Sequence, residues 1–408
     1  MKETKNVPQL RFSGFDDEWE NKEFSELFER RMERNNGQFG YDRWISVAKM
    51  YFQKPDKVTS NNIDTRTYVM RKSDIAFEGH SNKDYKLGRF VENDIGDGVI
   101  SELFPIYKHI ASYDLNYWKY AIQIERIMFP KLTKCIEISY TSSNKLDEYF
   151  FLKEHVLVPS CSEQKKIGTF LSHVDSLIQA KTKKLESLNA VKKSLLQKCF
   201  PKAGEKVPEM RFAGFSGEWE EKKLGEIAEK IMVGIANSAT YAYADKGIVM
   251  FRNQNIKPNY LDEDDLIYLQ PSFELTYKNK RLKENDVLVA RTGYPGTACV
   301  VPKKYENSQT FTTLILRLKQ DILEPYYVTQ YLNSPIGITY FTSTQIGGGQ
   351  KNSGASILSD MPFRYPSITE QQKIGQFFSK YDVLISAQQK EIDKLKDIKK
   401  SLLQKMFV

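Results

Sequence analysis

The chain contains the run Lys192-Lys193-Ser194-Leu195-Leu196-Gln197-Lys198 and, 207 residues later, the run Lys399-Lys400-Ser401-Leu402-Leu403-Gln404-Lys405. These runs belong to a longer repeat, in which residues 163–200 and 370–407 are identical at 21 of 38 positions. A second repeat relates residues 7–20 to residues 207–220, with nine of fourteen positions identical. Between the repeats the sequence diverges. Because two periods are too few for a solenoid, the pattern predicts a duplicated protein with two variable blocks.

Both copies of the 38-residue repeat are expected to be long helices. They lack internal proline, and Ser162 and Thr369 stand at plausible N-cap positions, each followed by glutamate in the first turn. Apolar residues recur at 3–4 spacing for about four heptads, which predicts an antiparallel coiled coil. Two separate amphipathic helices are the alternative. We assign eight apolar positions to the helix seam and subunit interface: Ile178, Leu185, Leu188, Leu195, Ile385, Ile392, Leu395 and Leu402.

The seam has polar interruptions at matched positions, Lys181 and Lys192 in the first copy and Gln388 and Lys399 in the second. At 1.5 Å per residue each helix would be about 57 Å long, which exceeds the width of a domain of about 140 residues. Four segments follow from this organisation: a first globular domain at 1–160, a central spacer helix at 161–205, a second globular domain at 206–367 and a C-terminal spacer helix at 368–408.

The variable blocks mix short β-branched runs with helical patches, which indicates a mixed α/β or α+β fold. We expect a helix at 325–332, closed by Asn333-Ser334-Pro335, and another at 115–127 that stops before Pro130. The expected strands of the first block are 68–70, 74–77 and 98–100, and those of the second are 248–251, 286–290 and 313–318.

Composition excludes several classes of protein. No apolar run approaches 18 residues, and no secretory signal is recognisable at the start, so a cytoplasmic protein without a membrane association is expected. The four cysteines lack C-x-x-C spacing, and we expect them to be reduced core thiols. Four dispersed histidines do not indicate a metal site.

The net charge of +8 resides in the two long helices. Residues 163–200 carry +5 and residues 370–408 carry +3, so the remainder is neutral overall. The lysines either form a solvated helix face or face DNA phosphates or an acidic partner. Because the blocks carry no surplus charge, we expect the chain to bind DNA weakly when it is alone.

Polar side chains that can read base edges or hold phosphates gather on the expected loops. The glycine run 347–349 lies among them but is not a phosphate-binding Walker loop, because no Gly-Lys-[Ser/Thr] follows at the required spacing. Nucleotide-cofactor and methyltransferase motifs are absent from the sequence, so we do not expect catalysis. The DNA-binding candidates are Arg252, Asn253, Arg291, Thr292, Tyr294, Gln345, Gln350, Lys351 and Asn352 in the second block, and His80, Lys83, Lys86, Ser142, Asn144 and Lys145 in the first.

This organisation resembles the specificity subunit of type I restriction–modification systems over nearly the whole chain. The second half carries the resemblance best, through Glu218-Trp219-Glu220, Leu224 to Ile227, Leu282 to Gly293, Gly348 to Asn352 and Glu370 to Ile374. The first half repeats the final motif as Pro159-Ser160, Glu163-Gln164 and Lys166-Ile167. It departs from the pattern at 141–145, where Thr-Ser-Ser-Asn-Lys replaces the glycine run.

The resemblance implies a non-catalytic subunit whose two globular domains are target-recognition domains. Each domain would read one half of an asymmetric, bipartite site on double-stranded DNA, and the helices would set the spacing and dock two adenine methyltransferase subunits. Restriction subunits would join through the methyltransferases, and S-adenosylmethionine, ATP and Mg²⁺ would bind to these partners. Two alternatives are a coiled-coil adaptor whose variable domains bind proteins and a stand-alone DNA-modifying enzyme.

Overall fold

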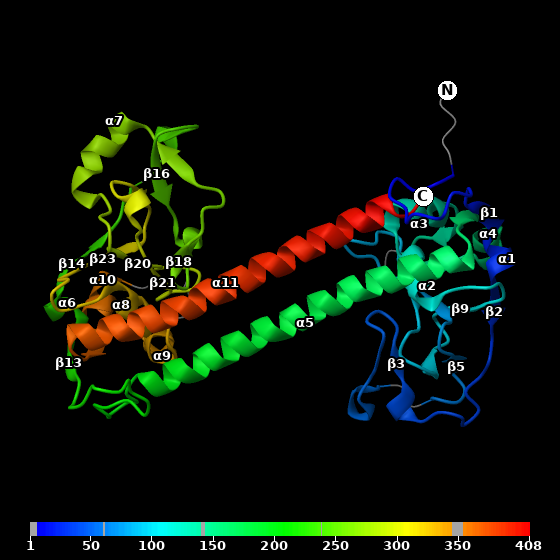
Figure 1. Cartoon of the computed structure of the whole chain (residues 1–408), viewed down its shortest axis with the longest axis horizontal. Coiled ribbons are helices and arrows are strands. Elements are labelled where there is room, and N and C mark those ends of the chain that lie inside the picture. The colour runs from blue at the N-terminus through cyan, green and yellow to red at the C-terminus, as the bar shows by residue number, and fades with distance from the viewer. Residues whose placement is uncertain (1–5, 60–61, 140–142, 238, 345–353) are drawn as a thin grey trace. The chain divides into compact units, whose positions relative to one another are not determined.

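The computed structural model describes residues 6–59, 62–139, 143–237, 239–344 and 354–408. The chain divides into two compact units, unit 1 (1–181 with 391–408) and unit 2 (182–390). The two long helices, α5 (Cys161–Cys199) and α11 (Ile368–Lys405), each contribute one part to unit 1 and one part to unit 2 (Figure 1). Among the helices of the described residues, none is long and apolar enough to cross a bilayer.

The caps of both long helices lie two residues earlier than expected, because α5 begins at Cys161 and α11 begins at Ile368. The backbone amide of Glu163 donates to Ser160 Oγ at 3.3 Å, and the amide of Glu370 donates to the carbonyl of Ser367 at 3.0 Å. The cap positions are therefore Ser160 and Ser367, and the expectation of Ser162 and Thr369 was wrong. A proline precedes each cap serine. Because proline has no backbone N–H to donate to a strand ladder, it ends the preceding strand, and the helix begins directly after the serine.

Unit 1 is built around a four-stranded antiparallel sheet with the order β2-β9-β6-β7. Its strands are β2 (Phe28–Arg31), β9 (Ile106–His109), β6 (Ile75–Glu78) and β7 (Arg89–Glu92). Smaller antiparallel pairs surround it: β1 (Glu20–Glu23) with β12 (His155–Val158), β3 (Ile45–Ser46) with β4 (Tyr51–Phe52), β5 (Thr67–Met70) with β8 (Gly98–Ser101), and β10 (Ile136–Glu137) with β11 (Lys145–Leu146). The three strands expected in the first block correspond to β5, β6 and β8.

The helices of unit 1 correct one expectation. They are α1 (Phe24–Leu27), α2 (Leu115–Ala121), α3 (Glu125–Cys135) and α4 (Glu148–Lys153). The break lies at 122–124 rather than before Pro130, which sits inside α3. An internal proline removes one helical hydrogen bond at a cost of about 3 kcal/mol. Burial of Met128, Leu132 and Cys135 on the core face of α3 offsets that cost.

Unit 2 repeats the main sheet as β14-β23-β20-β21 and adds a mixed sheet, β15-β19-β16-β22. The strands are β13 (Glu220–Lys223), β14 (Ala228–Val233), β15 (Tyr243–Ala244), β16 (Ile248–Phe251), β17 (Ile256–Lys257), β18 (Tyr260–Leu261), β19 (Ile267–Leu269), β20 (Val287–Val289), β21 (Ala298–Val300), β22 (Gln309–Thr310), β23 (Leu314–Leu318) and β24 (Pro362–Tyr365). The helices are α6 (Leu224–Ile227), α7 (Pro271–Glu274), α8 (Pro325–Leu332), α9 (Pro335–Ser343) and α10 (Ala355–Ser359). The expected helix at 325–332 and the three expected strands are confirmed.

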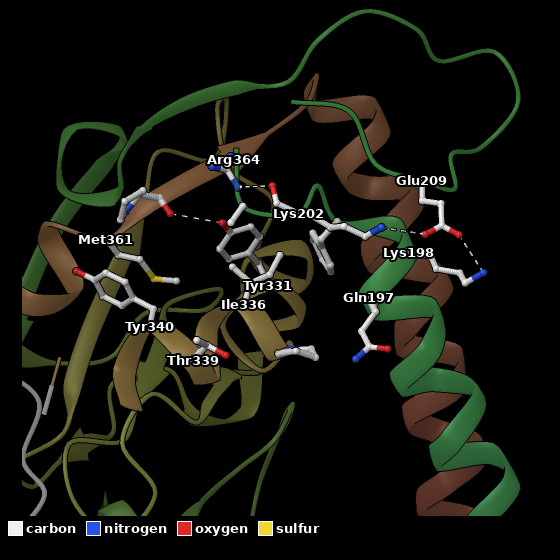
Figure 2. A pocket seen from close by; sticks show the side chains of 14 residues that line it. Gln197, Lys198, Lys202, Glu209, Tyr331, Ile336, Thr339, Tyr340, Met361 and Arg364 are labelled. Carbon is white, nitrogen blue, oxygen red and sulfur yellow. Dashed lines mark hydrogen bonds and ion pairs between the residues drawn. The ribbon is translucent and has the colours of Figure 1, made fainter. Parts of the chain in front are cut away.

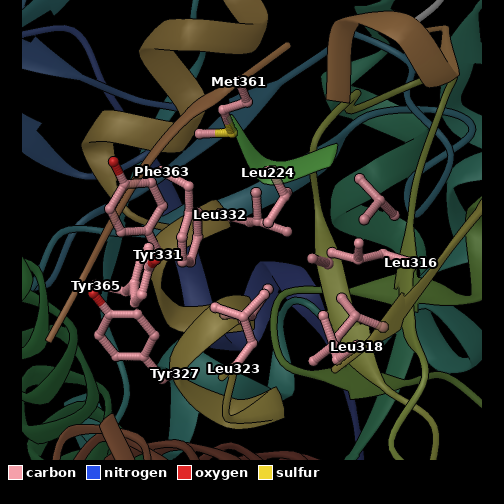
Figure 3. Close-up of a cluster of buried hydrophobic side chains, with 14 of the residues drawn as sticks. Leu224, Leu316, Leu318, Leu323, Tyr327, Tyr331, Leu332, Met361, Phe363 and Tyr365 are labelled. Carbon is pink, nitrogen blue, oxygen red and sulfur yellow. The ribbon is translucent and has the colours of Figure 1, made fainter. Parts of the chain in front are cut away.

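The core of unit 2 forms where α8 covers the main sheet. Figure 3 shows Leu316 and Leu318 of β23 on one side, with Tyr327, Tyr331 and Leu332 of α8 across from them. All five side chains are buried, which provides the main apolar stabilisation of the unit.

Both units share a set of parts that we call the frame: the repeated motif (7–20 or 207–220), the main sheet, and the adjoining ends of α5 and α11. In unit 1 the Trp19 ring lies 6.4 Å from Phe407 and 6.3 Å from Tyr117. In unit 2 the Trp219 ring lies 6.3 Å from Phe200 and 6.0 Å from Tyr327. The same two tryptophan contacts are therefore made in each frame.

A buried ion pair is repeated in the same way. Arg11 makes a two-pronged hydrogen-bonded pair with Glu163 at 2.7 and 2.8 Å, and Arg211 pairs with Glu370 at 2.7 Å through both prongs. Both carboxylates are only 1% exposed. Each repeated motif is therefore clamped to the start of the long helix that follows its own block.

The segments of α5 and α11 run antiparallel to each other within each unit. In unit 1, Asp175 pairs with Lys399 at 2.6 Å and Lys181 pairs with Glu391 at 2.7 Å. In unit 2, Lys192 pairs with Asp382, which is the equivalent of the Asp175–Lys399 pair under the offset of 207. The polar interruptions of the heptad pattern at Lys181, Lys192 and Lys399 are therefore ion-pair positions, and such positions can fix helix register.

The eight apolar seam positions are shielded to different degrees. Ile392 is buried, and the other seven side chains are half-buried. The helices thus form the expected antiparallel pair.

Three of the four cysteines (Cys135, Cys199 and Cys299) are buried free thiols, whereas Cys161 is exposed. The expectation of a core thiol was wrong for Cys161, because the first turn of α5 is turned to solvent there.

Candidate nucleic-acid interface

Two hairpin loops occupy equivalent places in the two frames. In unit 1 the loop 79–88 joins β6 to β7, and in unit 2 the loop 290–297 joins β20 to β21. Each hairpin uses the two strands at the same edge of the main sheet, and its first strand pairs with the central strand, β9 or β23. His80 and Thr292, which were chosen separately from the two blocks, therefore lie on equivalent hairpins of the two units.

The hairpin of unit 2 borders a pocket of about 690 Å³. The pocket brings together four of the expected residues, Arg252, Asn253, Thr292 and Tyr294, from two separate loops. The other lining residues are Gln254, Ile256, Lys257, Pro258, Ala290, Gly293, Thr297, Phe311 and Thr312. Among these described residues two are cationic and none is acidic, a composition that favours a polyanionic ligand.

Asn253 links the two loops of this pocket. Its Oδ1 accepts a hydrogen bond from the backbone amide of Arg291 at 2.7 Å, and its Nδ2 donates to Thr312 Oγ1 at 3.1 Å. Both ends of the amide are engaged within the domain. Asn253 therefore positions the hairpin through both ends of its amide.

Arg252 and Gln254 are held by one exposed carboxylate. Arg252 Nη2 donates to Asp265 Oδ2 at 2.8 Å, and Gln254 Nε2 donates to the same oxygen at 3.2 Å. The Arg252 hydrogen bond holds the pKa of Asp265 below its ordinary value. Because the Asp265 side chain is 77% exposed, an incoming phosphate can replace it as the partner of Arg252.

The tip of the hairpin presents Thr292, Gly293 and Tyr294 to solvent. Gly293 has a φ of 76°, a left-handed conformation that glycine adopts without strain. Gly296 has a φ of 92°, and a Cβ there would lie 2.1 Å from the Phe341 ring. The Tyr294 side chain is 85% exposed and adds an aromatic face beside the polar groups.

Unit 1 presents a different set of side chains on its hairpin. His80 is 65% exposed and its Nδ1 lies 2.6 Å from Glu78 Oε1, while Lys83 and Lys86 are exposed. Neighbouring Lys145 is also exposed. Asn144 is only 5% exposed: its Oδ1 accepts from the amide of Ser139 at 2.9 Å and its Nδ2 donates to Ser81 Oγ at 3.2 Å. The side chain of Asn144 thus links Ser81 of the hairpin to Ser139.

Five of the candidates lie outside the described residues: Ser142, Gln345, Gln350, Lys351 and Asn352. The remaining DNA-binding assignments stay predictions. The sequence-based selection missed Lys257, which lines the pocket with Gln254. The sequence contained a signal for Lys257. Polar residues continue past Arg252 and Asn253 in the run Arg252-Asn253-Gln254-Asn255-Ile256-Lys257. Where the coordinates describe side chains, no cluster of three or more potential metal ligands is found.

Comparison with known proteins connects this architecture to one family. Residues 216–397 match the model of the type I restriction modification DNA specificity domain. The specificity subunit of the type I restriction enzyme MjaVIII from Methanocaldococcus jannaschii is 21% identical over 298 residues, which cover 70% of this chain and 68% of that protein.

Two solved structures share the fold. The type I restriction–modification S subunit from M. genitalium aligns with a TM-score of 0.58 and 14% identity, covering 98% of this chain and 99% of that one. A chain from a study of complex assembly and conformational transition in the type I R-M system aligns with a TM-score of 0.56 and 16% identity, covering 97% and 99%.

A duplicated frame that presents two different polar hairpins defines a class of two-domain α/β recognition scaffolds. The domain match and the relatives point to the same kind of protein, the specificity subunits of type I restriction–modification systems. Residues 216–397 carry the specificity domain of that family, and over 298 residues the chain is similar to one of its members.

Proposed function

We propose that the chain is the DNA-recognition subunit of a type I restriction–modification complex, and that each unit reads one half of an asymmetric, bipartite site. The observation that carries this proposal is the pair of equivalent hairpins, which share a place in the frame but differ in their side chains. One hairpin offers His80 and two lysines, and the other offers Arg291, Thr292 and Tyr294. Different donors at equivalent places select different base pairs.

Arg291 and Arg252 are the side chains best suited to a base or phosphate contact in unit 2. An arginine guanidinium can donate two hydrogen bonds to guanine O6 and N7 in the major groove. Gln254 can pair with adenine, and Lys257 can hold a phosphate. Tyr294 offers an apolar and aromatic surface against a base edge or sugar.

The paired helices are proposed to hold the half-sites at a fixed spacing and to dock two adenine methyltransferase subunits, through which restriction subunits join. The lysine-rich composition of the helices suits an anionic neighbour. The chain itself would catalyse no reaction. S-adenosylmethionine, ATP and Mg²⁺ would bind to the partner subunits, which would also extrude the target adenine.

A genome-wide map of N6-methyladenine, made with and without the gene, tests this function. Loss of methylation at one split motif with unequal halves is the expected result. Unchanged methylation in cells that express a co-purifying methyltransferase subunit would contradict it.

Charge reversal at Arg291 separates DNA recognition from a protein-adaptor role. The Arg291→Glu variant should lose methylation of the split motif, because a carboxylate beside the phosphates opposes binding. Co-purification with the methyltransferase subunits should persist, since the side chain lies on the hairpin. If methylation persists as well, Arg291 does not contact the target.

Without its partners the chain should bind specific DNA weakly. The blocks carry no net surplus charge, so few counterions are released on binding. Electrophoretic mobility shifts at about 150 mM salt should show tight binding only after methyltransferase subunits are added. Nanomolar binding by the chain alone would contradict this expectation.

A further inference from the structure

A second pocket lies in unit 2 where α5 ends, and the proposed DNA contacts do not use it. Its volume is about 660 Å³. Figure 2 shows Lys198 and Glu209 on the side formed by α5, with Thr339, Tyr340 and Met361 across the pocket. The other lining residues are Gln197, Phe200, Lys202, Ala203, Tyr331, Pro335, Ile336, Pro362 and Arg364.

The equivalent place in unit 1 is filled by the chain itself. Arg126, the second residue of α3, donates from Nη2 to the carbonyl of Phe407 at 2.7 Å and to that of Gln404 at 3.1 Å. Helix α9 of unit 2 follows α8 as α3 follows α2, and its second residue is Ile336. Phe200 and Gln197 are the repeat equivalents of Phe407 and Gln404. The shorter Ile336 therefore leaves open a space that Arg126 closes in unit 1.

The interior of this pocket is suited to an apolar side chain. Pro335 and Ile336 are half-buried and present carbon surface, and the buried side chains of Phe200, Tyr331 and Met361 form the wall behind them. The hydroxyl of Tyr340 donates to the carbonyl of Ile357 at 2.9 Å, and that of Tyr331 donates to the carbonyl of Pro362 at 3.4 Å. Both hydroxyls are thus engaged, and mainly carbon surface remains for a ligand.

The rim of the pocket is positively charged. Lys198 and Lys202 share a single carboxylate, with their Nζ atoms 3.0 and 3.5 Å from the two oxygens of Glu209. Arg364 also lines the pocket, and it pairs with Glu221 at 2.5 Å. Three cations against one lining carboxylate favour a ligand with an acidic group at the mouth, because a second carboxylate can recruit either lysine.

We propose that this pocket docks a segment of a methyltransferase partner that carries a large apolar side chain next to a carboxylate. The identity of the partner rests on the proposed function, whereas the chemistry of the occupant rests on the lining residues. Since the Arg126 side chain lies at the equivalent place in unit 1, unit 2 is the unit whose described residues offer this anchor. The two partner subunits would therefore bind with unequal affinity, and the anchored one would bind more tightly.

A pair of small probes tests the chemistry of the pocket without any partner. N-acetylphenylalanine carries the aromatic group and the carboxylate, and its amide lacks only the charge. Titrated into the full chain, the acid should shift the methyl NMR signals of Ile336 and Met361, with about tenfold higher affinity than the amide, as expected for one charge-assisted hydrogen bond. Absence of these shifts with the acid, or equal affinity for acid and amide, would overturn the proposal.

Four substitutions sharpen the probe experiment. Ile336→Arg reproduces the closure made by Arg126 and should abolish binding of the acid, whereas Ile338→Arg, on an exposed part of the same helix, should leave it unchanged. Glu209→Gln frees both lysines and should strengthen binding. Lys202→Glu should weaken it. An Ile336→Arg chain that folds and binds the acid as the wild type does would contradict the assignment.

Assembly with the methyltransferase tests the occupant. Titration of purified methyltransferase subunits into the wild-type chain should give two binding steps, of which Ile336→Arg weakens the tighter one by at least about tenfold, while Ile338→Arg changes neither. Equal assembly by all three chains would reject the methyltransferase as the occupant. A wild-type chain that takes up no methyltransferase would instead contradict the proposed function, and the probe result would stand separately.

Discussion

Unit 1 and unit 2 share the contacts that hold the motif, the main sheet and the long helices together, yet their hairpins carry different side chains. Trp19 and Trp219 meet matching aromatic partners, and Arg11 and Arg211 meet matching buried carboxylates. At the tip of the same sheet, however, His80 stands where the second unit has Thr292. The comparison teaches that the duplicated residues maintain the contacts of the frame, while the diverged residues of the hairpins face solvent, where they can contact a ligand.

Two further differences lie inside the frames. Leu318 of unit 2 ends β23, where the equivalent end of β9 in unit 1 carries the buried His109. Ile336 stands in place of Arg126, and a pocket is open beside Ile336 in unit 2. We therefore expect the two units to differ in acid sensitivity as well as in surface, and each difference can be tested by exchanging one residue.

The largest expected effect comes from removing the repeated arginine. Arg11→Met and Arg211→Met each leave a carboxylate that is 1% exposed without its partner, which should destabilise the affected unit by about 3–5 kcal/mol. Urea unfolding followed by ¹⁹F NMR of fluorotryptophan resolves the units, because Trp219 is the one tryptophan of residues 182–390. Equal losses in both units would support equivalent frames. A large loss in only one of them would break the equivalence.

The second-largest expected effect is on the stability of the chain at acid pH. Burial lowers the pKa of His109 to about 3, so the folded state binds fewer protons than the unfolded chain between pH 3 and the ordinary value of 6.5. Stability from this residue is therefore complete above pH 6.5 and is lost as pH falls toward 3. His109→Leu, which copies Leu318, should gain about 2 kcal/mol relative to the wild type between pH 7 and pH 5.

The nearby Glu92 is protonated more readily than an ordinary glutamate, because burial raises its pKa, and it is present in both chains. Its contribution has the opposite sign and largely cancels in the comparison. His80→Leu, at an exposed histidine of the same unit, is the matched control. If the wild type proves the more acid-stable chain, His109 is charged in the folded protein.

The smallest effect is expected at the helix seam. Two equivalent ion pairs are removed by Lys399→Met and by Lys192→Met. Double-mutant cycles, which combine Lys399→Met with Asp175→Ala and Lys192→Met with Asp382→Ala, should give coupling energies of about 0.5–1 kcal/mol. The Lys192 pair should be the stronger, since Lys192 is 11% exposed and Lys399 is 25% exposed. Denaturant unfolding measures both couplings. A larger value for Lys399 would contradict the dependence on burial.

Much of the fold could be predicted from the sequence, because repeats and helical periodicity are local signals. The polar heptad interruptions were visible at Lys192 and Lys399, but their partners, Asp382 and Asp175, depend on an antiparallel register that only packing defines. Pro130 misled the helix assignment, because burial of its neighbours outweighs the missing hydrogen bond. Whether a proline ends a helix therefore depends on how deeply its neighbours are buried in the folded chain.

The candidate interface was predictable by residue type and less so by role. Arg252 and Thr292 do meet at one pocket. Asn253 and Asn144 are base-reading candidates in the sequence, and in the structure the amide of each also makes two hydrogen bonds within its own unit. The sequence shows no sign of these partners, because they lie 38 and 59 residues away from Asn253 along the chain.

The most direct test of two equivalent frames that read different half-sites is an exchange of blocks. A chain in which residues 21–160 replace residues 221–367 should fold, since both blocks fit the same repeated motif and helix ends. A methylation map of cells that express this chain with its methyltransferase should show a split motif with two identical halves. Retention of the original unequal halves, or a folded complex that methylates no motif, would contradict this interpretation.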